Sequence, residues 1–188
     1  MLQTADYGRH VFIRCAEFAN SKPDADEAAW ARLKRQEWLY QPGNKLHVLM
    51  WQAALHVRLC PPPVLAAQLD RLVEVIDMDT VSLGIVPLGA SLRIAPANGF
   101  CILDNRVAVT EDPLTEQRLD DTHSIATYMK AWSTLRESAA FGADAQNLTL
   151  SEGLGAAAVG GPARCSGEHR AGPFPSPHDA SGIREERA

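Results

Sequence analysis

Apolar residues recur at the spacing of amphipathic helices in four stretches of the chain. These stretches cover residues 3–20, about 25–40, 61–76 and 124–141. The clearest is the third, where one stripe contains Leu65, Leu69, Leu72, Val73 and Ile76. Three prolines precede this stripe, and proline suits the first turn of a helix because the N–H that it lacks would have no partner there. We therefore predict that the stripe faces the core, where each large side chain contributes about 1.5–3 kcal/mol on burial.

The first two predicted helices are separated by Ser21–Asp24, a stretch that contains proline and interrupts the pattern. The first helix has an apolar face made of Tyr7, Phe12, Cys15 and Phe18. The second helix is acidic in its first turn and basic further along, which matches the helix dipole and supports its assignment. We expect this second helix to continue to about Tyr40.

Four shorter stretches have the composition of strands. They cover residues 46–50, 81–86, 100–103 and 106–110. The last two are joined at Asp104-Asn105, a pair that tolerates the positive φ angles of a tight hairpin turn. Gly84 lies inside the second stretch, which indicates that another element approaches the strand closely there. This order of elements predicts an α+β (mixed α/β) domain with a small, partly antiparallel sheet packed with amphipathic helices.

The composition of the chain changes after Ala158. Residues 159–188 contain several prolines and glycines, charges of both signs and few apolar side chains. Such a segment buries too little surface to offset the entropy lost on ordering. We therefore predict one folded domain over residues 1–158, followed by a disordered tail over residues 159–188.

Composition and charge argue against several classes of protein. Of the 188 residues, 46% are hydrophobic and 22% are charged, and the net charge of −5 lacks the basic surface that binds nucleic acids. No apolar run approaches the roughly 20 residues that span a bilayer, and the chain does not open like a signal peptide, so we expect a cytoplasmic protein. The four cysteines are scattered without a CxxC pair, and we expect neither a metal nor a cofactor.

Several stretches, taken in order, resemble one bacterial family. They are Leu2–Tyr7, Arg32–Gln36, Val48–Leu55, Gln68–Leu72, Val81–Leu88 and Gly99–Phe100. Together they are similar to the C-terminal domain of unknown function of Xre-type helix-turn-helix transcriptional regulators, which are chiefly actinobacterial. Val48–Leu55 in particular resembles the antitoxin-like branch of these regulators.

This resemblance implies a sensor or partner-binding domain rather than an enzyme. Antitoxin-like members are thought to act with a small protein encoded next to them, which binds the regulator and modifies its activity on DNA. The DNA-binding head of the family would precede Leu2, and a chain without a recognition helix would not bind DNA itself. The family also often has glutamate where this chain has Gln52, which keeps an acceptor oxygen but loses the charge.

Four residues are our candidates for contact with a protein partner: Trp38, Arg35, Trp51 and Gln52. Tryptophan anchors both cores and interfaces, and this chain has four of them, at positions 30, 38, 51 and 132. We expect most of them in the core; if one is exposed, we expect Trp38, because Lys34 and Arg35 are close to it in the sequence. The partner would be a small acidic or neutral protein, or a second copy of this chain through self-association.

Two alternatives stay open. A small hydrolase or metal-assisted enzyme would combine His47 or His56 with carboxylates from acidic loops. The acidic candidates are Asp77, Asp79, Asp104, Glu111 and Asp112. The spacing of His47 and His56 does not place them on one face, so surface histidines and solvated loops are the simpler interpretation. The second alternative is a non-functional remnant of a gene.

Overall fold

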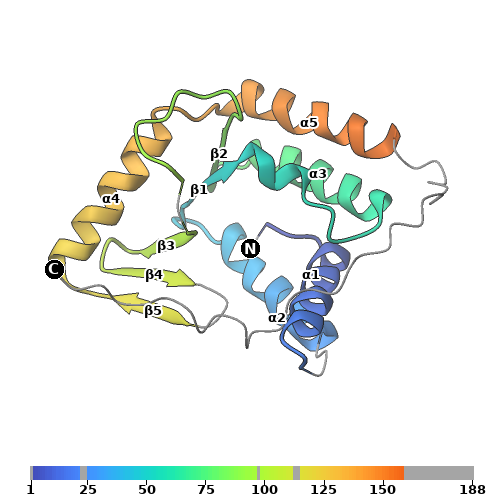
Figure 1. Ribbon diagram of the computed structural model, residues 1–188, viewed down its shortest axis with the longest axis horizontal. Coiled ribbons are helices and arrows are strands. Elements are labelled where there is room, and N and C mark those ends of the chain that lie inside the picture. Colours follow the sequence, from blue (N-terminus) through green and yellow to red (C-terminus); the bar gives the residue numbers. More distant parts are fainter. Residues whose placement is uncertain (1, 22–24, 97, 112–114, 159–188) are drawn as a thin grey trace, which may run out of the picture.

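The computed structural model describes residues 2–21, 25–96, 98–111 and 115–158. In chain order its elements are α1 (Ala5–Phe18), α2 (Ala25–Lys34), η1 (Arg35–Tyr40), β1 (Leu46–Trp51), η2 (Gln52–His56), α3 (Pro62–Ile76), β2 (Val81–Val86), β3 (Phe100–Leu103), β4 (Val107–Glu111), β5 (Glu116–Leu119), α4 (Thr122–Arg136) and α5 (Gly142–Ala158). The elements η1 and η2 are 3₁₀ helices. The fold is α+β, as predicted (Figure 1).

The strands form two separate sheets rather than the single sheet that the sequence suggests. β1 and β2 are parallel, with Trp51 opposite Val86 at their carboxyl ends. β3, β4 and β5 form an antiparallel sheet in chain order. Parallel strands need a long crossover, which α3 supplies here, whereas a tight turn joins β3 to β4. In that turn Asp104 and Asn105 have φ angles of 50° and 55°, which confirms the predicted hairpin.

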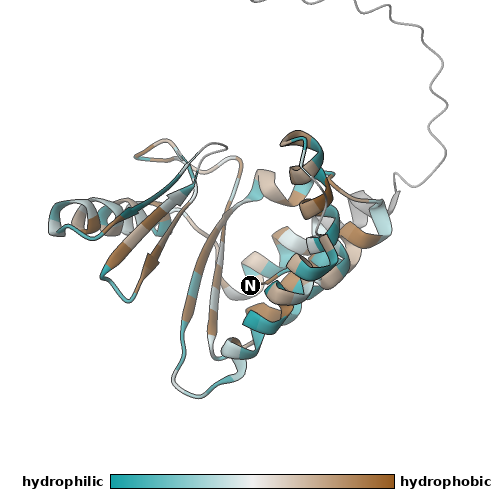
Figure 2. Cartoon of the chain, turned by 90° about the horizontal axis from the view of Figure 1, so that it is seen from below, coloured by the Kyte–Doolittle hydropathy of each residue, from teal (hydrophilic) through white to brown (hydrophobic). Residues whose placement is uncertain are grey.

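The parallel pair separates two groups of elements (Figure 1, Figure 2). On one side lie α1, α2, α3 and α5, and on the other lie α4 and the three-stranded sheet. The main core lies on the helical side, against the parallel pair. Its buried apolar residues are Leu2, Leu39, Leu55, Leu65, Leu69, Leu72, Val75, Val81, Leu83, Ile85 and Ala145.

The stripe of α3 is largely as predicted. Leu65, Leu69 and Leu72 are buried, but Val75 is buried in place of Val73. The buried face also contains the polar Gln68, and its inclusion rotates that face away from Val73. Apolar spacing alone therefore misplaces one edge of the stripe.

The predicted apolar face of α1 is only partly correct. The helix meets the core through its first two turns, where Tyr7 is partly buried and Gly8 is buried. Cys15 and Phe18 are exposed, Phe18 to 79%. The C-terminal end of α1 therefore extends into solvent, and its apolar spacing does not report burial.

The second predicted helix does not continue to Tyr40 as an α-helix. It ends at Lys34, and the chain tightens there into η1. Residues three apart share one side of a 3₁₀ helix, and this places both Gln36 and Leu39 in the interior. Helical periodicity of 3.6 residues does not anticipate this change of winding.

The last predicted helix ends at Arg136 rather than at Phe141. Ala140 exchanges two backbone hydrogen bonds with Ile85 of β2, at 2.8 and 2.9 Å, and these bonds replace those of a continuing helix. α5 then begins at Gly142, whose φ of 55° suits glycine. Our prediction contains neither α5, which lacks a regular apolar stripe, nor β5, which is mostly polar.

Two predictions concern the chain as a whole. The tail expected to be disordered, residues 159–188, lies outside the described residues. Within the described ranges, no helix combines the length and the apolar content of a membrane-spanning segment.

Candidate functional site

The structure separates the four residues that we predicted to contact a partner. Trp38 and Arg35 are exposed in η1. Trp51 and Gln52 are consecutive at the carboxyl end of β1, where Trp51 lines a cavity that neither Trp38 nor Arg35 reaches. The described part of the chain therefore offers two candidate sites rather than one.

The first candidate is an exposed surface formed by α2 and η1, which we call the α2–η1 surface. Its side chains are Trp30, Leu33, Lys34, Arg35, Trp38 and Tyr40. Trp30 is 61% exposed, Trp38 38% and Tyr40 62%, so Trp38 is exposed, but Trp30 is more exposed than the residue we chose. None of the four tryptophans is buried, so our expectation that most of them lie in the core is wrong. Aromatic residues are enriched at protein interfaces, and this short segment presents three of them to solvent.

Cations accompany these aromatic rings. Lys34 Nζ lies 4.8 Å from the centroid of the Trp30 ring. Arg35 and Trp38 are three residues apart in a 3₁₀ helix, and they therefore share one side of it. Residues 30–40 contain three cations and one anion, although the whole chain has a net charge of −5. The α2–η1 surface thus combines aromatic and positively charged groups on an acidic protein.

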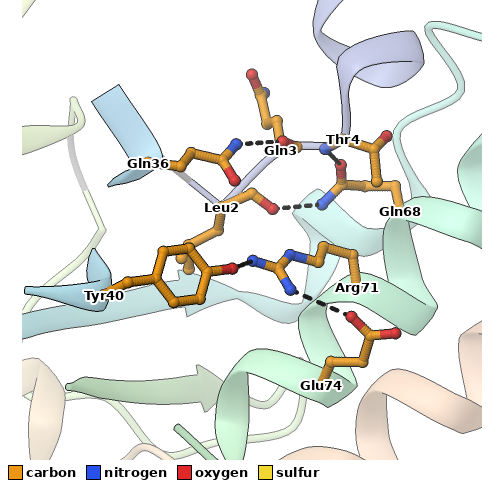
Figure 3. Close-up of polar contacts among 8 residues, drawn as sticks. All are labelled: Leu2, Gln3, Thr4, Gln36, Tyr40, Gln68, Arg71 and Glu74. Atoms are coloured by element: carbon orange, nitrogen blue, oxygen red, sulfur yellow. Dashed lines mark hydrogen bonds and ion pairs between the residues drawn. The ribbon is translucent and has the colours of Figure 1, made fainter. Parts of the chain in front are cut away.

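Tyr40 is held in place by α3 (Figure 3). Arg71 Nη2 donates a hydrogen bond to the Tyr40 hydroxyl at 2.8 Å, and Arg71 Nη1 lies 3.2 Å from Glu74 Oε2. Partial burial acts to lower the pKa of the Arg71 guanidinium, but the hydrogen bonds with Tyr40 and Glu74 outweigh it and raise that pKa. Arg71 therefore stays charged and fixes the edge of the α2–η1 surface against α3.

Next to this surface, two buried glutamines hold the segment that precedes α1 (Figure 3). Gln68 Nε2 donates to the Leu2 carbonyl at 3.1 Å, and Gln68 Oε1 accepts from the Thr4 N–H at 2.7 Å. Gln36 Nε2 donates to the Gln3 carbonyl at 2.5 Å. Two side chains thereby satisfy backbone groups of three successive residues, as a neighbouring strand would. We call this arrangement the N-terminal clamp.

None of the predictions from the sequence contains the N-terminal clamp. The signal available was Gln68, a polar residue within the buried face of an otherwise apolar helix. A buried carboxamide needs partners, because an unpaired polar group is costly away from water. The pattern alone does not reveal those partners, since they lie 64 and 66 positions away along the chain.

The second candidate is a cavity of about 570 Å³ between the parallel pair, the three-stranded sheet and α4. Trp51 and Val86, the last residues of β1 and β2, lie opposite each other and form one wall together with Leu49. Residues 94–96 and 98–99, from the connection between β2 and β3, contribute a further side. Ligands of open α/β sheets often bind at the carboxyl ends of parallel strands, which is the edge that this cavity occupies.

The remaining walls are a row of side chains across the three-stranded sheet and one face of α4. Phe100, Thr110 and Gln117 are register partners across β3, β4 and β5, and all three line the cavity. α4 contributes Tyr128, Ala131, Trp132 and Leu135. The spacing of these four residues places them on one face of the helix. The Phe100 and Tyr128 rings meet with centroids 5.0 Å apart, so the sheet and α4 are in direct contact at this corner.

The side chains that face this cavity are uncharged. Glu111 is the one carboxylate among the lining residues, but side chains alternate along β4, so its carboxylate lies on the sheet face opposite to Thr110. Cys101 is on the same face as Glu111, and the pKa of its thiol is raised by burial and by the nearby Glu111 carboxylate. The other polar side chains among the lining residues are those of Thr110, Gln117, Asn98 and Tyr128, and of these Thr110 and Gln117 are register partners on the sheet wall.

Gln52 directly follows Trp51 and contacts the connection after β2. Its Oε1 accepts a hydrogen bond from the Leu88 N–H at 2.9 Å. The family resemblance associates this position with glutamate, which carries an equivalent acceptor oxygen. The bond to Leu88 gives Gln52 a structural contact, and its contact with a partner stays a prediction.

The histidines of the enzyme alternative lie apart. His47 lines a second, shallower hollow of about 490 Å³ together with Ser133 and Glu137. The Glu137 carboxylate pairs with Arg93 at 2.8 Å, and within the described residues no hydrogen bond joins it to His47. His56 ends η2, which continues from the opposite end of β1. Nucleophilic catalysis would need a nucleophile and a base within hydrogen-bonding reach of each other.

The acidic candidates are also scattered. Asp77 accepts a hydrogen bond from Gln146 Nε2 at 2.8 Å, and the backbone carbonyl of Asp79 accepts one from Lys45. Asp112 lies outside the described residues. Among the described residues, no group of three or more histidine, cysteine, aspartate or glutamate side chains is placed to hold a metal ion.

No curated protein and no solved structure matches this chain. One family matches it over residues 1–148, a span that contains both candidate sites and the N-terminal clamp. The match covers well over half of the 188 residues. The chain therefore belongs to the DUF5753 family, which is described as a domain of unknown function.

Proposed function

We propose that this chain is the partner-binding effector domain of an Xre-type transcriptional regulator of the antitoxin-like branch. It acts in the cytoplasm, by binding a small protein rather than by catalysis. The observation that carries the proposal is the α2–η1 surface, where exposed Trp30 and Trp38 accompany Lys34 and Arg35.

The resemblance in sequence supports the type of regulator. The stretches from Leu2–Tyr7 to Gly99–Phe100 that resemble these regulators all fall within the residues that match the DUF5753 family. Several of them also carry the structural features described above. Arg32–Gln36 joins α2 to η1, and Gln68–Leu72 contains the glutamine of the N-terminal clamp.

The chemistry of the α2–η1 surface indicates an acidic partner with some apolar character. Aromatic side chains supply large contact areas and often dominate the energy of an interface. Cations beside them attract acidic groups and exclude basic ones. Within the described residues Arg35 has no hydrogen-bond or ion-pair partner, so its guanidinium is available to a carboxylate. A second copy of this acidic chain is the other occupant that the same chemistry allows.

The N-terminal clamp supports a role in regulation. In a full regulator, a DNA-binding head would join this domain through the segment that contains Leu2 and Thr4. Gln36 holds that segment from η1, the same helix that presents Arg35 and Trp38 on its outer side. A partner docked on η1 would therefore contact the element that fixes the attachment point of the head.

The test is a calorimetric titration of this chain with the small protein encoded next to its gene. We expect Trp38→Ala and Arg35→Glu each to weaken binding at least about tenfold, as for anchor residues of an interface. Leu103→Ala is the matched control, because Leu103 is a similarly exposed apolar residue at 44% on β3. Binding should also weaken with added salt, because part of the attraction is between charges.

Two outcomes would change the assignment. Unaltered binding by both Trp38→Ala and Arg35→Glu would remove the α2–η1 surface from the proposal. A dimer that sedimentation velocity shows for the wild type, and that Trp38→Ala converts to monomer, would identify a second copy of the chain as the occupant.

A further inference from the structure

The cavity between the parallel pair and α4 has the size of a ligand pocket. Such pockets measure about 300–1,000 Å³. This cavity measures about 570 Å³. It also does not coincide with the α2–η1 surface, since none of the residues of that surface lines it.

The helix beside the cavity is only partly packed: α4 meets the three-stranded sheet at Phe100 and Tyr128 but is not covered along its length. α4 has no fully buried residue, although it is 15 residues long. Its apolar face, which includes Ala131, Trp132 and Leu135, is turned to the cavity instead of to a filled core. Burying such a face normally supplies most of the stability of a helix, so an occupant of the cavity would complete the packing of α4.

The walls define the shape of that occupant. Trp51 from the parallel pair, Phe100 from the sheet and Tyr128 and Trp132 from α4 supply four aromatic rings. Rings placed on several sides of a cavity favour a flat apolar body, because aromatic groups pack in offset-stacked or edge-to-face arrangements.

The polar groups define its charge. Thr110 and Gln117 are opposite each other on β4 and β5, and within the described residues neither side chain has a hydrogen-bond partner. Side chains alternate along β4, so the side chain of Glu111, the one charged group among the lining residues, is directed to the sheet face opposite to Thr110 and Gln117. A charged ligand would lose its hydration without compensation, whereas a neutral group would pair with this hydroxyl and carboxamide.

We propose that this cavity binds a small uncharged molecule with a flat apolar body and one hydrogen-bonding end. The apolar body lies among Trp51, Phe100 and Trp132, and the polar end meets Thr110 and Gln117. This inference goes beyond the proposed partner and does not rest on it, because the two sites share no residue.

The test uses a series of naphthalene probes that differ in charge, titrated into the chain by calorimetry. We expect saturable 1:1 binding of neutral 2-naphthamide, and binding at least about tenfold weaker for 2-naphthoate and for 2-naphthylmethylammonium. Equal binding of the charged and neutral probes, or no saturable binding of 2-naphthamide, would overturn the proposal.

Substitutions in α4 and β4 test whether the probe binds in the cavity. Ala131→Trp fills the space beside α4 and should abolish binding, whereas Ala126→Trp on the exposed side of the same helix should leave it unchanged. Thr110→Val keeps the shape of the side chain but removes its hydroxyl. It should weaken the binding of 2-naphthamide about fivefold and leave the binding of naphthalene unchanged. If circular dichroism shows that Ala131→Trp does not fold, the comparison of the two probes in Thr110→Val decides whether the probe binds in the cavity.

The remaining outcomes would also overturn the proposal. Equal loss of binding in Ala131→Trp and Ala126→Trp, with both variants folded, would show that the probe does not occupy this cavity. Loss of binding to the neighbouring protein in Ala131→Trp, with no saturable binding of any probe to the wild type, would assign the cavity to a protein side chain instead.

Discussion

A methyl group on Gly84 would lie 2.6 Å from the ring of Phe141, because that ring rests directly on the backbone of β2. Leu49 approaches the same position from β1, with Cδ2 at 2.9 Å. The two backbone hydrogen bonds between Ile85 and Ala140 bring Phe141 to this place. The contact joins the parallel pair to the connection between α4 and α5.

Gly84→Ala should therefore destabilise the fold. The added methyl group forces the Phe141 ring or Leu49 to move, and overpacking of this kind typically costs about 1–3 kcal/mol. Urea unfolding followed by circular dichroism measures the effect. Gly89→Ala is the matched control, because no atom lies within 4 Å of the methyl group that it would add.

The cause of that loss is separable by a double-mutant cycle. Phe141→Ala removes the ring that the new methyl group would meet, so Gly84→Ala should cost less in that background than in the wild type. Costs that simply add would show that the strain lies elsewhere, for example against Leu49.

Gln68→Ala should destabilise the fold more than an ordinary surface substitution in α3. It leaves the Leu2 carbonyl and the Thr4 N–H without their partner, and an unsatisfied buried group costs about 1–3 kcal/mol. We expect amide hydrogen exchange at Thr4 to accelerate in this variant. Asp70→Ala is the control, because Asp70 is exposed on the same helix; equal exchange at Thr4 in the two variants would contradict the N-terminal clamp.

Gln52→Glu and Gln52→Ala should differ at Leu88. Glutamate keeps an acceptor for the Leu88 N–H, whereas alanine does not. Hydrogen exchange at Leu88 should therefore stay slow in Gln52→Glu and become faster in Gln52→Ala. The same exchange rate in both variants would mean that the bond does not hold the connection after β2.

The parts of the fold that the sequence predicts well depend on local patterns. Leu65, Leu69 and Leu72 report the buried face of α3, and Asp104-Asn105 reports the hairpin, because spacing and turn chemistry act between near neighbours. The resemblance to a family also predicted a domain of unknown function, and the match to DUF5753 confirms that part of the prediction.

The parts that it misses depend on distant contacts. The end of α4 is set by hydrogen bonds between Ala140 and Ile85, and the N-terminal clamp by Gln68, which acts across 64 and 66 positions. The candidate cavity is of the same kind, since its walls come from β1, β2, β3, β4, β5 and α4. Trp51 was a candidate from the sequence, but its wall partners Thr110 and Gln117 carried no signal until the register of the sheet placed them together.

The pH dependence of stability should contain a contribution from Asp121, the N-cap of α4. Hydrogen bonding to Ser124, first from its side chain and second from its N–H at 2.9 Å, lowers the pKa of Asp121 below its ordinary value of 3.8. A carboxyl group whose pKa is lower in the folded state stabilises the fold above its unfolded pKa. This contribution is lost as the pH falls through the folded pKa.

Asp121→Asn isolates that contribution, because asparagine caps a helix about as well as aspartate but does not ionise. The wild type should unfold at a higher temperature than Asp121→Asn at pH 7, since the carboxylate also interacts favourably with the N-terminal end of the helix dipole. The difference between the two melting temperatures should shrink below about pH 4 and vanish once the carboxyl group of the folded protein is protonated. Thermal unfolding at pH 7, 5 and 3 measures this difference, and a difference that stays constant or grows on acidification would show that the Asp121 charge does not act through this cap.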